Sequence, residues 1–162
     1  MEAYRQGVIH LPEGEGHSLW LAGELYTAKV GGEETGGAFA LAEAKTPPGG
    51  GPPPHIHYRE DEVLYVLEGE LDFMVEGETV KARAGSFLYI PRGTLHTYRN
   101  VGSGPARYLG MVTPAGLEKF FEEVSVPATS ETSSPPPFEE EDLQRLLAVA
   151  SKYGLEIRPS GQ

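Results

Sequence analysis

Three of the five histidines in this 162-residue chain lie with a glutamate in two short segments, at spacings typical of metal ligands. Glycines and prolines stand at fixed distances around them. The segments are Gly49-x5-His55-x-His57-x4-Glu62-x6-Gly69 and Gly85-x5-Pro91-x-Gly93-x2-His96-x3-Asn100. Because ligand and turn residues together fit one arrangement, a metal centre is the first hypothesis for this chain.

Strand geometry explains the spacing of these residues. His55 and His57 are two positions apart, so they share one face of a strand. Glu62 has the wrong parity for that strand, and the polar residues 58–61 favour a turn before a second strand. A hairpin there would return Glu62 to face the two histidines from the neighbouring strand. His96 follows a proline–glycine turn signature, so a third strand is expected to present it to the same point.

The donor set is three imidazoles and one carboxylate, which suits one divalent transition metal ion. Iron, manganese, nickel, cobalt, copper and zinc all accept such ligands, so the sequence leaves the metal's identity open. A single histidine in a strand is more often a satisfied polar residue, but the joint pattern favours a metal site. His10 and His17 lie outside the pattern and are predicted to be solvated surface residues.

The two segments resemble the two sequence motifs of the cupin superfamily at every defining position. Residues 50–69 read GGPPPHIHYREDEVLYVLEG, and residues 85–100 read GSFLYIPRGTLHTYRN. The resemblance implies an all-β fold, an antiparallel cupin (jelly-roll) β-barrel with a metal near its centre. By the same matching, His55, His57, Glu62 and His96 correspond to the family's four ligands.

Composition and periodicity predict a barrel followed by helices. Twenty-one glycines and fourteen prolines indicate many turns between short strands. Residues 1–112 are predicted to form the barrel domain with its N-terminal strands, and residues 113–162 a C-terminal helical extension. Strands are expected at 18–21, 25–30, 38–44, 62–67, 71–75, 86–90, 96–100 and 106–113.

The expected extension consists of two helices. Thr113 is predicted to cap the first helix, with Pro114 in its first turn and an apolar stripe within 117–124. Residues 125–137 are rich in proline, serine and threonine and read as a linker. A second helix is expected over 139–153. Its apolar stripe, like that of the first helix, is predicted to pack on the barrel or on a second subunit.

The charge and the residue types exclude several classes of protein. The formal net charge of −11 argues against binding to nucleic acid or an anionic membrane, because phosphates would be repelled. The chain has no cysteine, so disulfides and thiolate metal sites are excluded. Its N-terminus lacks the layout of a signal peptide, and no apolar run has the length of a membrane span. We therefore expect a cytoplasmic protein.

A narrower resemblance concerns function. Residues 32–62, 91–102 and 112–124 look like bacterial cupins described as quercetin 2,3-dioxygenase-like. This implies a metal-dependent dioxygenase that cleaves a flavonol or a related aromatic ring-ketone with O2. In this interpretation Glu62 is also the catalytic residue, because it accepts the proton of the substrate's hydroxyl. Many established flavonol dioxygenases carry two cupin barrels where this chain has one, which weakens the substrate assignment more than the reaction class.

Two alternatives come from other functional classes, because fold does not fix function. One is a non-catalytic cupin that binds or senses a small molecule. The other is a metal-dependent isomerase or hydrolase that acts on a sugar or a small acid.

Strand parity also predicts where a small-molecule substrate would lie. Leu64 and Val66 share the inward face with Glu62, and Tyr98 shares it with His96. The three side chains are therefore candidate lining residues of a mainly apolar substrate pocket. Simple barrel core explains Leu64 and Val66 equally well, which makes Tyr98 the better candidate for substrate contact.

The opposite face of the same strand predicts a homodimer. Val63, Tyr65 and Leu67 make this face apolar as well, so the strand has to be covered on both sides. The barrel interior covers one side. N-terminal strands, the C-terminal helices or a second subunit would cover the other.

Overall fold

The computed structural model describes residues 7–129 and 134–159, and this part of the chain is mostly β-structure. The strands are β1 (His17–Leu21), β2 (Glu24–Val30), β3 (Ala40–Thr46), β4 (His55–His57), β5 (Asp61–Glu68), β6 (Glu70–Val75), β7 (Glu78–Arg83), β8 (Phe87–Ile90), β9 (His96–Asn100), β10 (Ala106–Thr113), β11 (Val126–Pro127) and β12 (Leu155–Ile157). The helices are α1 (Gly32–Thr35), α2 (Leu117–Val124) and α3 (Glu140–Ala150), followed by the short 3₁₀ helix η1 (Ser151–Tyr153).

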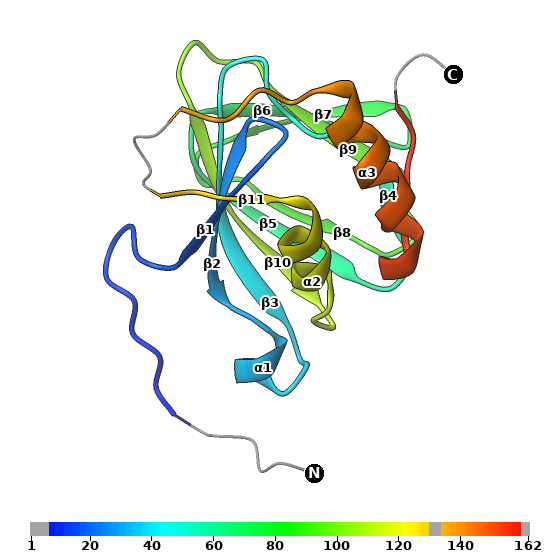
Figure 1. Ribbon diagram of the computed structural model, residues 1–162. Coiled ribbons are helices and arrows are strands. Elements are labelled where there is room, and N and C mark those ends of the chain that lie inside the picture. Colours follow the sequence, from blue (N-terminus) through cyan, green and yellow to red (C-terminus); the bar gives the residue numbers. More distant parts are fainter. Residues whose placement is uncertain (1–6, 130–133, 160–162) are drawn as a thin grey trace.

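The strands form two antiparallel sheets that face each other (Figure 1). The seven-stranded sheet has the order β11-β1-β2-β3-β10-β5-β8, and the five-stranded sheet has the order β12-β4-β9-β6-β7. Consecutive strands thus repeatedly cross from one sheet to the other, as in a jelly roll. The predicted all-β jelly-roll fold is confirmed, although its sheets form a sandwich rather than one continuously hydrogen-bonded barrel.

The main core fills the space between the sheets. Leu64 and Val66 of β5 and Leu71 and Phe73 of β6 are at most 1% exposed. Each comes from alternate positions of its strand, which is the pattern of residues that face one side of a sheet. Burial of such a side chain contributes about 1.5–3 kcal/mol, so these residues hold the two sheets together.

A second apolar cluster lies beneath the helices. Leu117, Phe120 and Val124 form the buried stripe of α2, and Leu146 and Ala150 form that of α3. The two helices contact each other, and α2 also packs against β1 and α3 against β12 (Figure 1). The stripes therefore pack on the sheets of their own chain, one of the two coverings that the sequence allowed. No helix within the described residues is long and apolar enough to cross a membrane.

The predicted start of the first helix is wrong. Thr113 is the last residue of β10, where it pairs with Asp61 of β5, and its hydroxyl donates to the carbonyl oxygen of Ala38. Gly116 takes the N-cap position instead, so α2 begins at Leu117. Tertiary pairing of the strand has overridden a local capping signal.

Three strands were not predicted because each has at most two apolar residues in alternation, too few to show a clear period. Only Ala82 of β7 is buried, and β11 and β12 are two and three residues long. The short β12 matters for the site because it pairs with β4 along its whole length, from Leu155↔His57 to Ile157↔His55.

The hairpin expected between β4 and β5 is also wrong. β4 pairs with β9 and β12, whereas β5 pairs with β10 and β8 in the other sheet. Residues 58–60 therefore cross from one sheet to the other. Because the interior faces of the two sheets oppose each other, Glu62 still reaches the two histidines, but from across the sandwich rather than from a neighbouring strand.

Candidate metal centre

Four side chains from three strands meet between the sheets. His55 and His57 come from β4, His96 comes from the paired position on β9, and Glu62 comes from β5 of the opposite sheet. One potential ligand atom from each lies within 4.8 Å of the others. His57 and His96 are buried, and His55 and Glu62 are partly buried. The structure thus brings together all four residues that the sequence singled out as ligands.

The backbone fixes the orientation of two imidazole rings. Nδ1 of His55 donates to the carbonyl oxygen of Pro53 at 2.9 Å, and Nδ1 of His96 donates to that of Thr94 at 3.0 Å. In each ring Nδ1 carries the proton that it donates to the backbone, so Nε2 is the atom that could bind a metal ion inside the sandwich. Both acceptors lie two residues before the histidine, in the proline-containing segments that precede β4 and β9.

Glu62 contacts two of the imidazoles. Its Oε2 is 2.8 Å from Nε2 of His96 and 3.5 Å from Nε2 of His57. Burial on its own would raise the pKa of this carboxyl, but the hydrogen bond with His96 and the neighbouring imidazoles lower it to about 2. Burial likewise opposes charge on His96, yet the contact with Glu62 raises the pKa of that imidazole.

These geometric and electrostatic features fit a metal ion. Burial, together with the neighbouring His96 and His57, lowers the pKa of His55 to about 3, which keeps this imidazole in the neutral form that ligates metals. The ionised carboxylate of Glu62 is stabilised by a positive partner, and without a metal a proton on His96 supplies that charge. A divalent cation among the same four donor atoms would take over that role. The donor set suits a first-row transition metal and does not select one.

His57 has a further neighbour that the sequence did not reveal. Its Nδ1 lies 3.8 Å from Oε2 of Glu60, and neither atom has a hydrogen-bond partner, although Glu60 is only 3% exposed. Burial, opposed by Arg59 and Arg92, raises the pKa of Glu60 to about 7. Sequence reasoning assigned Glu60 to a polar turn, because nothing local shows that the turn is covered by the C-terminal segment.

The ligand cluster opens onto a cavity of about 750 Å³. Its wall includes His55, His57 and Glu62 together with apolar and aromatic side chains such as Leu19, Leu21, Ala44, Phe120 and Phe121. A space of this size is typical of sites for small organic molecules. The solvent-exposed His17 also lines it, and His10 is exposed, as predicted for both.

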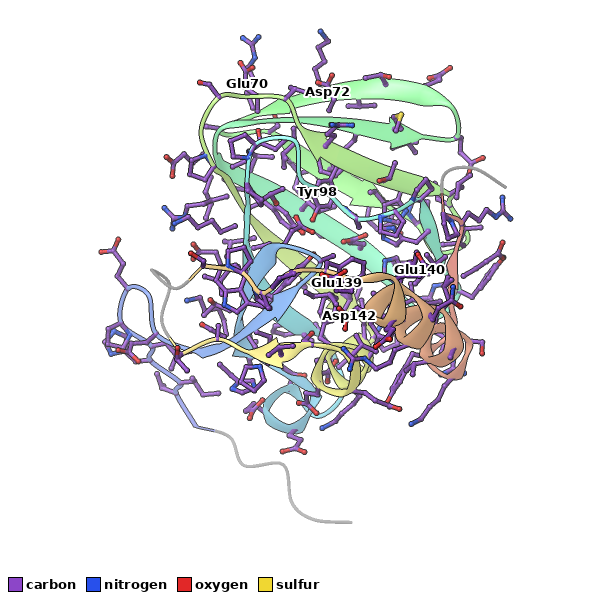
Figure 2. The ribbon with its side chains drawn as sticks, turned by 45° about the horizontal axis from the view of Figure 1, so that its top comes forward. Glu70, Asp72, Tyr98, Glu139, Glu140 and Asp142 are labelled. Carbon is purple, nitrogen blue, oxygen red and sulfur yellow. The ribbon has the colours of Figure 1, made fainter. Side chains whose placement is uncertain are left out.

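The three candidate pocket residues have different positions. Tyr98 is 5% exposed and lines the cavity, and Figure 2 shows it in the interior between the strands of the two sheets. Leu64 and Val66 belong to the packed core and are not part of the cavity wall. Contact of any of the three with a substrate stays a prediction.

A buried glutamate in the cavity wall was missed altogether. Glu24 on β2 is 1% exposed and binds the hydroxyls of Tyr26, Tyr98 and Thr46. A glutamate in a strand is normally solvent-exposed, so no local signal marks it as buried. The predicted mainly apolar interior therefore holds a second polar group besides the ligand cluster.

Comparison with known proteins agrees with this architecture. Residues 42–112, which contain all four clustered side chains, match the family described as Cupin domain. This chain carries a cupin domain. The matched segment runs from β3 to β10 and so includes both sides of the ligand cluster.

Three relatives illustrate the range of proteins that this cupin resembles. It is 29% identical over 117 residues to quercetin 2,3-dioxygenase of Bacillus subtilis, a match that covers 72% of this chain and 34% of the relative. It is 40% identical over 77 residues to a germin-like protein of Arabidopsis thaliana, covering 44% of this chain and 35% of the relative. The match to the uncharacterized protein MJ1618 of Methanocaldococcus jannaschii is 36% over 70 residues, 43% of this chain and 56% of the relative. The chain thus spans about a third to a half of the lengths of these relatives.

Solved structures share the fold. KdgF from Halomonas sp. superposes with a TM-score of 0.62 at 18% identity, covering 70% of this chain and 99% of that chain. A structure described as a predicted oxalate decarboxylase from Thermotoga maritima also gives a TM-score of 0.62, at 23% identity, covering 65% and 99% of the two chains. Nearly the whole of each neighbour corresponds to one sandwich of this cupin.

Proposed function

We propose that this cupin is a metal-dependent dioxygenase that cleaves a flavonol or a related aromatic ring-ketone with O2. The observation that carries the proposal is the cluster of His55, His57, Glu62 and His96 at the wall of a cavity that has the size of a small-molecule site. The similarity to quercetin 2,3-dioxygenase over 72% of the chain supports this reaction over the others that cupins perform.

The chain's own residues supply binding, a proton acceptor and a restricted environment. His55, His57, His96 and Glu62 would hold a divalent transition metal ion, which would supply Lewis acidity and redox chemistry. Glu62 is positioned to accept the proton of a substrate hydroxyl that enters the cluster, because its Oε2 already lies among the imidazoles. Apolar and aromatic side chains around the cavity would hold a planar ring system and limit its contact with water.

Two other functions use the same site. A binding or sensing cupin would need the cavity but not turnover. An isomerase or hydrolase of a sugar or small acid would use the metal without O2. The acidic lining of the cavity weighs against small anionic acids as substrates, because it supplies few positive charges to pair with them.

Incubation with quercetin in air and under nitrogen tests the proposed activity. The metal-loaded protein should consume O2 in proportion to the loss of the flavonol's visible absorbance, and the loss should stop under nitrogen. Tight binding without absorbance loss in air would favour the sensor. Turnover of a sugar or small acid at equal rates with and without O2 would favour the third function.

We also propose that the protein is a homodimer. The outer face of the seven-stranded sheet exposes Tyr65 and Leu67 of β5 beside Phe87 and Tyr89 of β8. Within the described residues β8 is one of the two edge strands of this sheet, so its free backbone groups lie next to exposed apolar side chains. A second copy related by a two-fold axis would cover both the edge and the apolar face at once.

A further inference from the structure

Hydroxyl groups converge on the buried carboxylate of Glu24 at the inner wall of the cavity. Thr46 donates to Oε1 at 2.5 Å, Tyr98 donates to the same oxygen at 2.9 Å, and Tyr26 donates to Oε2 at 2.8 Å. The hydroxyl of Tyr108 lies 2.6 Å from that of Tyr98. Each donor comes from a different strand, so the network ties β2, β3, β9 and β10 together around one carboxylate.

An inventory of protons shows what this network offers to a ligand. At a pH where the Glu24 carboxylate is ionised, Tyr26, Tyr98 and Thr46 each use their single proton on it, so Tyr108 has to donate its own proton to Tyr98. Burial and the charge of Glu24 raise the pKa of Tyr26 and of Tyr98 well above its usual value, so both remain protonated phenols. The oxygens of Tyr26 and Tyr108 retain lone pairs, and both side chains line the cavity. This wall therefore accepts hydrogen bonds but has no proton left to donate.

The charges around the cavity also disfavour an anionic ligand. Its lining includes seven glutamates, two lysines and no arginine among the described residues. Both lysines already have partners, since Lys29 donates to the carbonyl oxygen of Glu15 and Lys119 pairs with Glu33 and Glu122. An anionic group at the inner wall would meet the Glu24 carboxylate with no cation to neutralise it.

We propose that Glu24, Tyr26, Tyr98 and Tyr108 form a second binding position of the cavity, which accepts a hydroxyl of an uncharged, hydroxylated aromatic ligand and rejects a carboxylate. The discrimination rests on hydrogen-bond polarity, because only a ligand that brings its own proton can pair with this wall. The position deepens the proposed function, on which it rests for the class of ligand. It selects the ligand's far end, whereas the histidine cluster receives the reacting end.

The two positions are close enough for one ligand to contact both. His96 and Tyr98 are alternate residues of β9, so their side chains share a face of the strand about 7 Å apart. Figure 2 shows Tyr98 in the interior, between the strands and away from the rim where Glu70 lies. A molecule of two or three aromatic rings can therefore reach from the cluster to the hydroxyl-accepting wall.

Anaerobic binding titrations of the full metal-loaded chain test this assignment without turnover. The probes are quercetin, 3-hydroxyflavone, which lacks the outer hydroxyls, and 3-hydroxyflavone with a carboxylate on its outer ring. The wild-type protein should bind quercetin roughly tenfold or more tighter than 3-hydroxyflavone and should bind the carboxylate probe most weakly.

Two variants test whether the hydrogen-bond network around Glu24 causes the preference for quercetin. Tyr108→Phe should reduce the preference for quercetin by about three- to tenfold and leave the affinity for 3-hydroxyflavone within about twofold. Glu24→Gln should reduce the same preference and bind the carboxylate probe more tightly than the wild type does. Tyr65→Phe and Glu70→Gln are the matched controls, because both side chains lie outside the cavity wall.

The result that would overturn the inference is an unchanged preference for quercetin over 3-hydroxyflavone in Tyr108→Phe, which keeps the proposal testable even if Glu24→Gln fails to fold. Equal binding of the carboxylate probe and 3-hydroxyflavone by the wild type would overturn it too. These outcomes are separate from the proposed reaction. Hydroxyl preference without turnover would refute only the dioxygenase, and turnover without hydroxyl preference would refute only this binding position.

Discussion

Nδ1 of His57 faces Oε2 of Glu60 at 3.8 Å, and both atoms are buried without a hydrogen-bond partner. His55 and His96 direct Nδ1 to backbone carbonyls, but His57 has this carboxylate in place of a carbonyl. A histidine that ligates a metal through Nε2 commonly donates its other nitrogen to a carboxylate or a carbonyl, which fixes the ring and increases its basicity. Glu60 is therefore a candidate positioning residue for His57.

Removal of this carboxylate should weaken metal binding. We expect Glu60→Ala to lower metal affinity by roughly 10- to 100-fold, because the imidazole of His57 loses the carboxylate that faces its Nδ1. Glu60→Gln keeps an oxygen acceptor and should recover part of the loss. Titration with a divalent metal, alongside thermal unfolding of the metal-free protein, measures the two effects separately. Glu68→Gln, which removes a carboxylate from the exposed surface, is the control. If both Glu60 variants change the melting temperature but not the metal affinity, Glu60 has only a structural role.

The ligand cluster could be predicted from the sequence because short local patterns place its histidines. His55 and His57 share a strand face by parity, and the turn residues before β9 place His96 at the strand's first position. The predicted hairpin between β4 and β5 was wrong. The two strands belong to different sheets because β4 pairs with β12 and β9, whereas β5 pairs with β10 and β8. The short sequence of one strand does not specify which other strand it pairs with.

Glu24 shows what local reasoning cannot reach. Its strand begins with a charged residue, which predicts exposure, and its burial is possible only because donors arrive from β3 and β9, more than twenty residues away. A buried carboxylate is tolerated where its oxygens are satisfied. Glu60 was missed for a related reason, because its covering segment comes from distant parts of the chain.

Substitution of Glu62 distinguishes its role as a metal ligand from its role as a proton acceptor. Glu62→Gln retains an oxygen donor and the size of the side chain, so some metal should remain bound, whereas turnover should fall by roughly 10²- to 10⁴-fold with the loss of charge and basicity. His55→Ala, His57→Ala and His96→Ala each delete a donor and should lose the metal itself. Metal content and flavonol turnover are measured on the same purified samples. A Glu62→Gln protein that binds metal and works at the wild-type rate would leave the carboxylate a structural role alone.

The exposed face of β5 and β8 predicts the oligomeric state. Sedimentation at micromolar concentration should give a species of about twice 17.5 kDa. Phe87→Lys should dissociate it, because a two-fold interface would bring two copies of the new charge close together. Met74→Lys, at a residue of β6 with 48% exposure in the other sheet, serves as the matched control and should stay dimeric. A wild-type protein found only at 17.5 kDa would rule the dimer out.

Glu24 gives the stability of the protein a dependence on pH. Burial raises the pKa of its carboxyl above the ordinary value of 4.5, although the hydrogen bonds from Thr46, Tyr26 and Tyr98 oppose the shift. A group whose pKa is raised in the folded state stabilises the fold fully below its unfolded pKa, and this contribution is lost as the pH rises through the folded pKa. In that window the folded protein binds the proton that the unfolded chain has released, so the free energy of unfolding decreases with increasing pH.

Glu24→Gln cannot titrate and isolates this contribution. From about pH 4 upward, the wild type should lose stability relative to Glu24→Gln by about 1.4 kcal/mol for each unit by which burial raises the pKa, and the difference should level off once the folded carboxyl is ionised. Urea denaturation of both proteins at a series of pH values measures it, with the exposed Glu70→Gln as the matched control for the loss of one carboxylate. A constant difference would mean that the hydroxyls around Glu24 just offset its burial, so that its pKa is the same in the folded and unfolded states. A difference that favours the wild type as the pH rises would mean that the hydrogen bonds from Thr46, Tyr26 and Tyr98 outweigh burial and lower the pKa of the folded carboxyl.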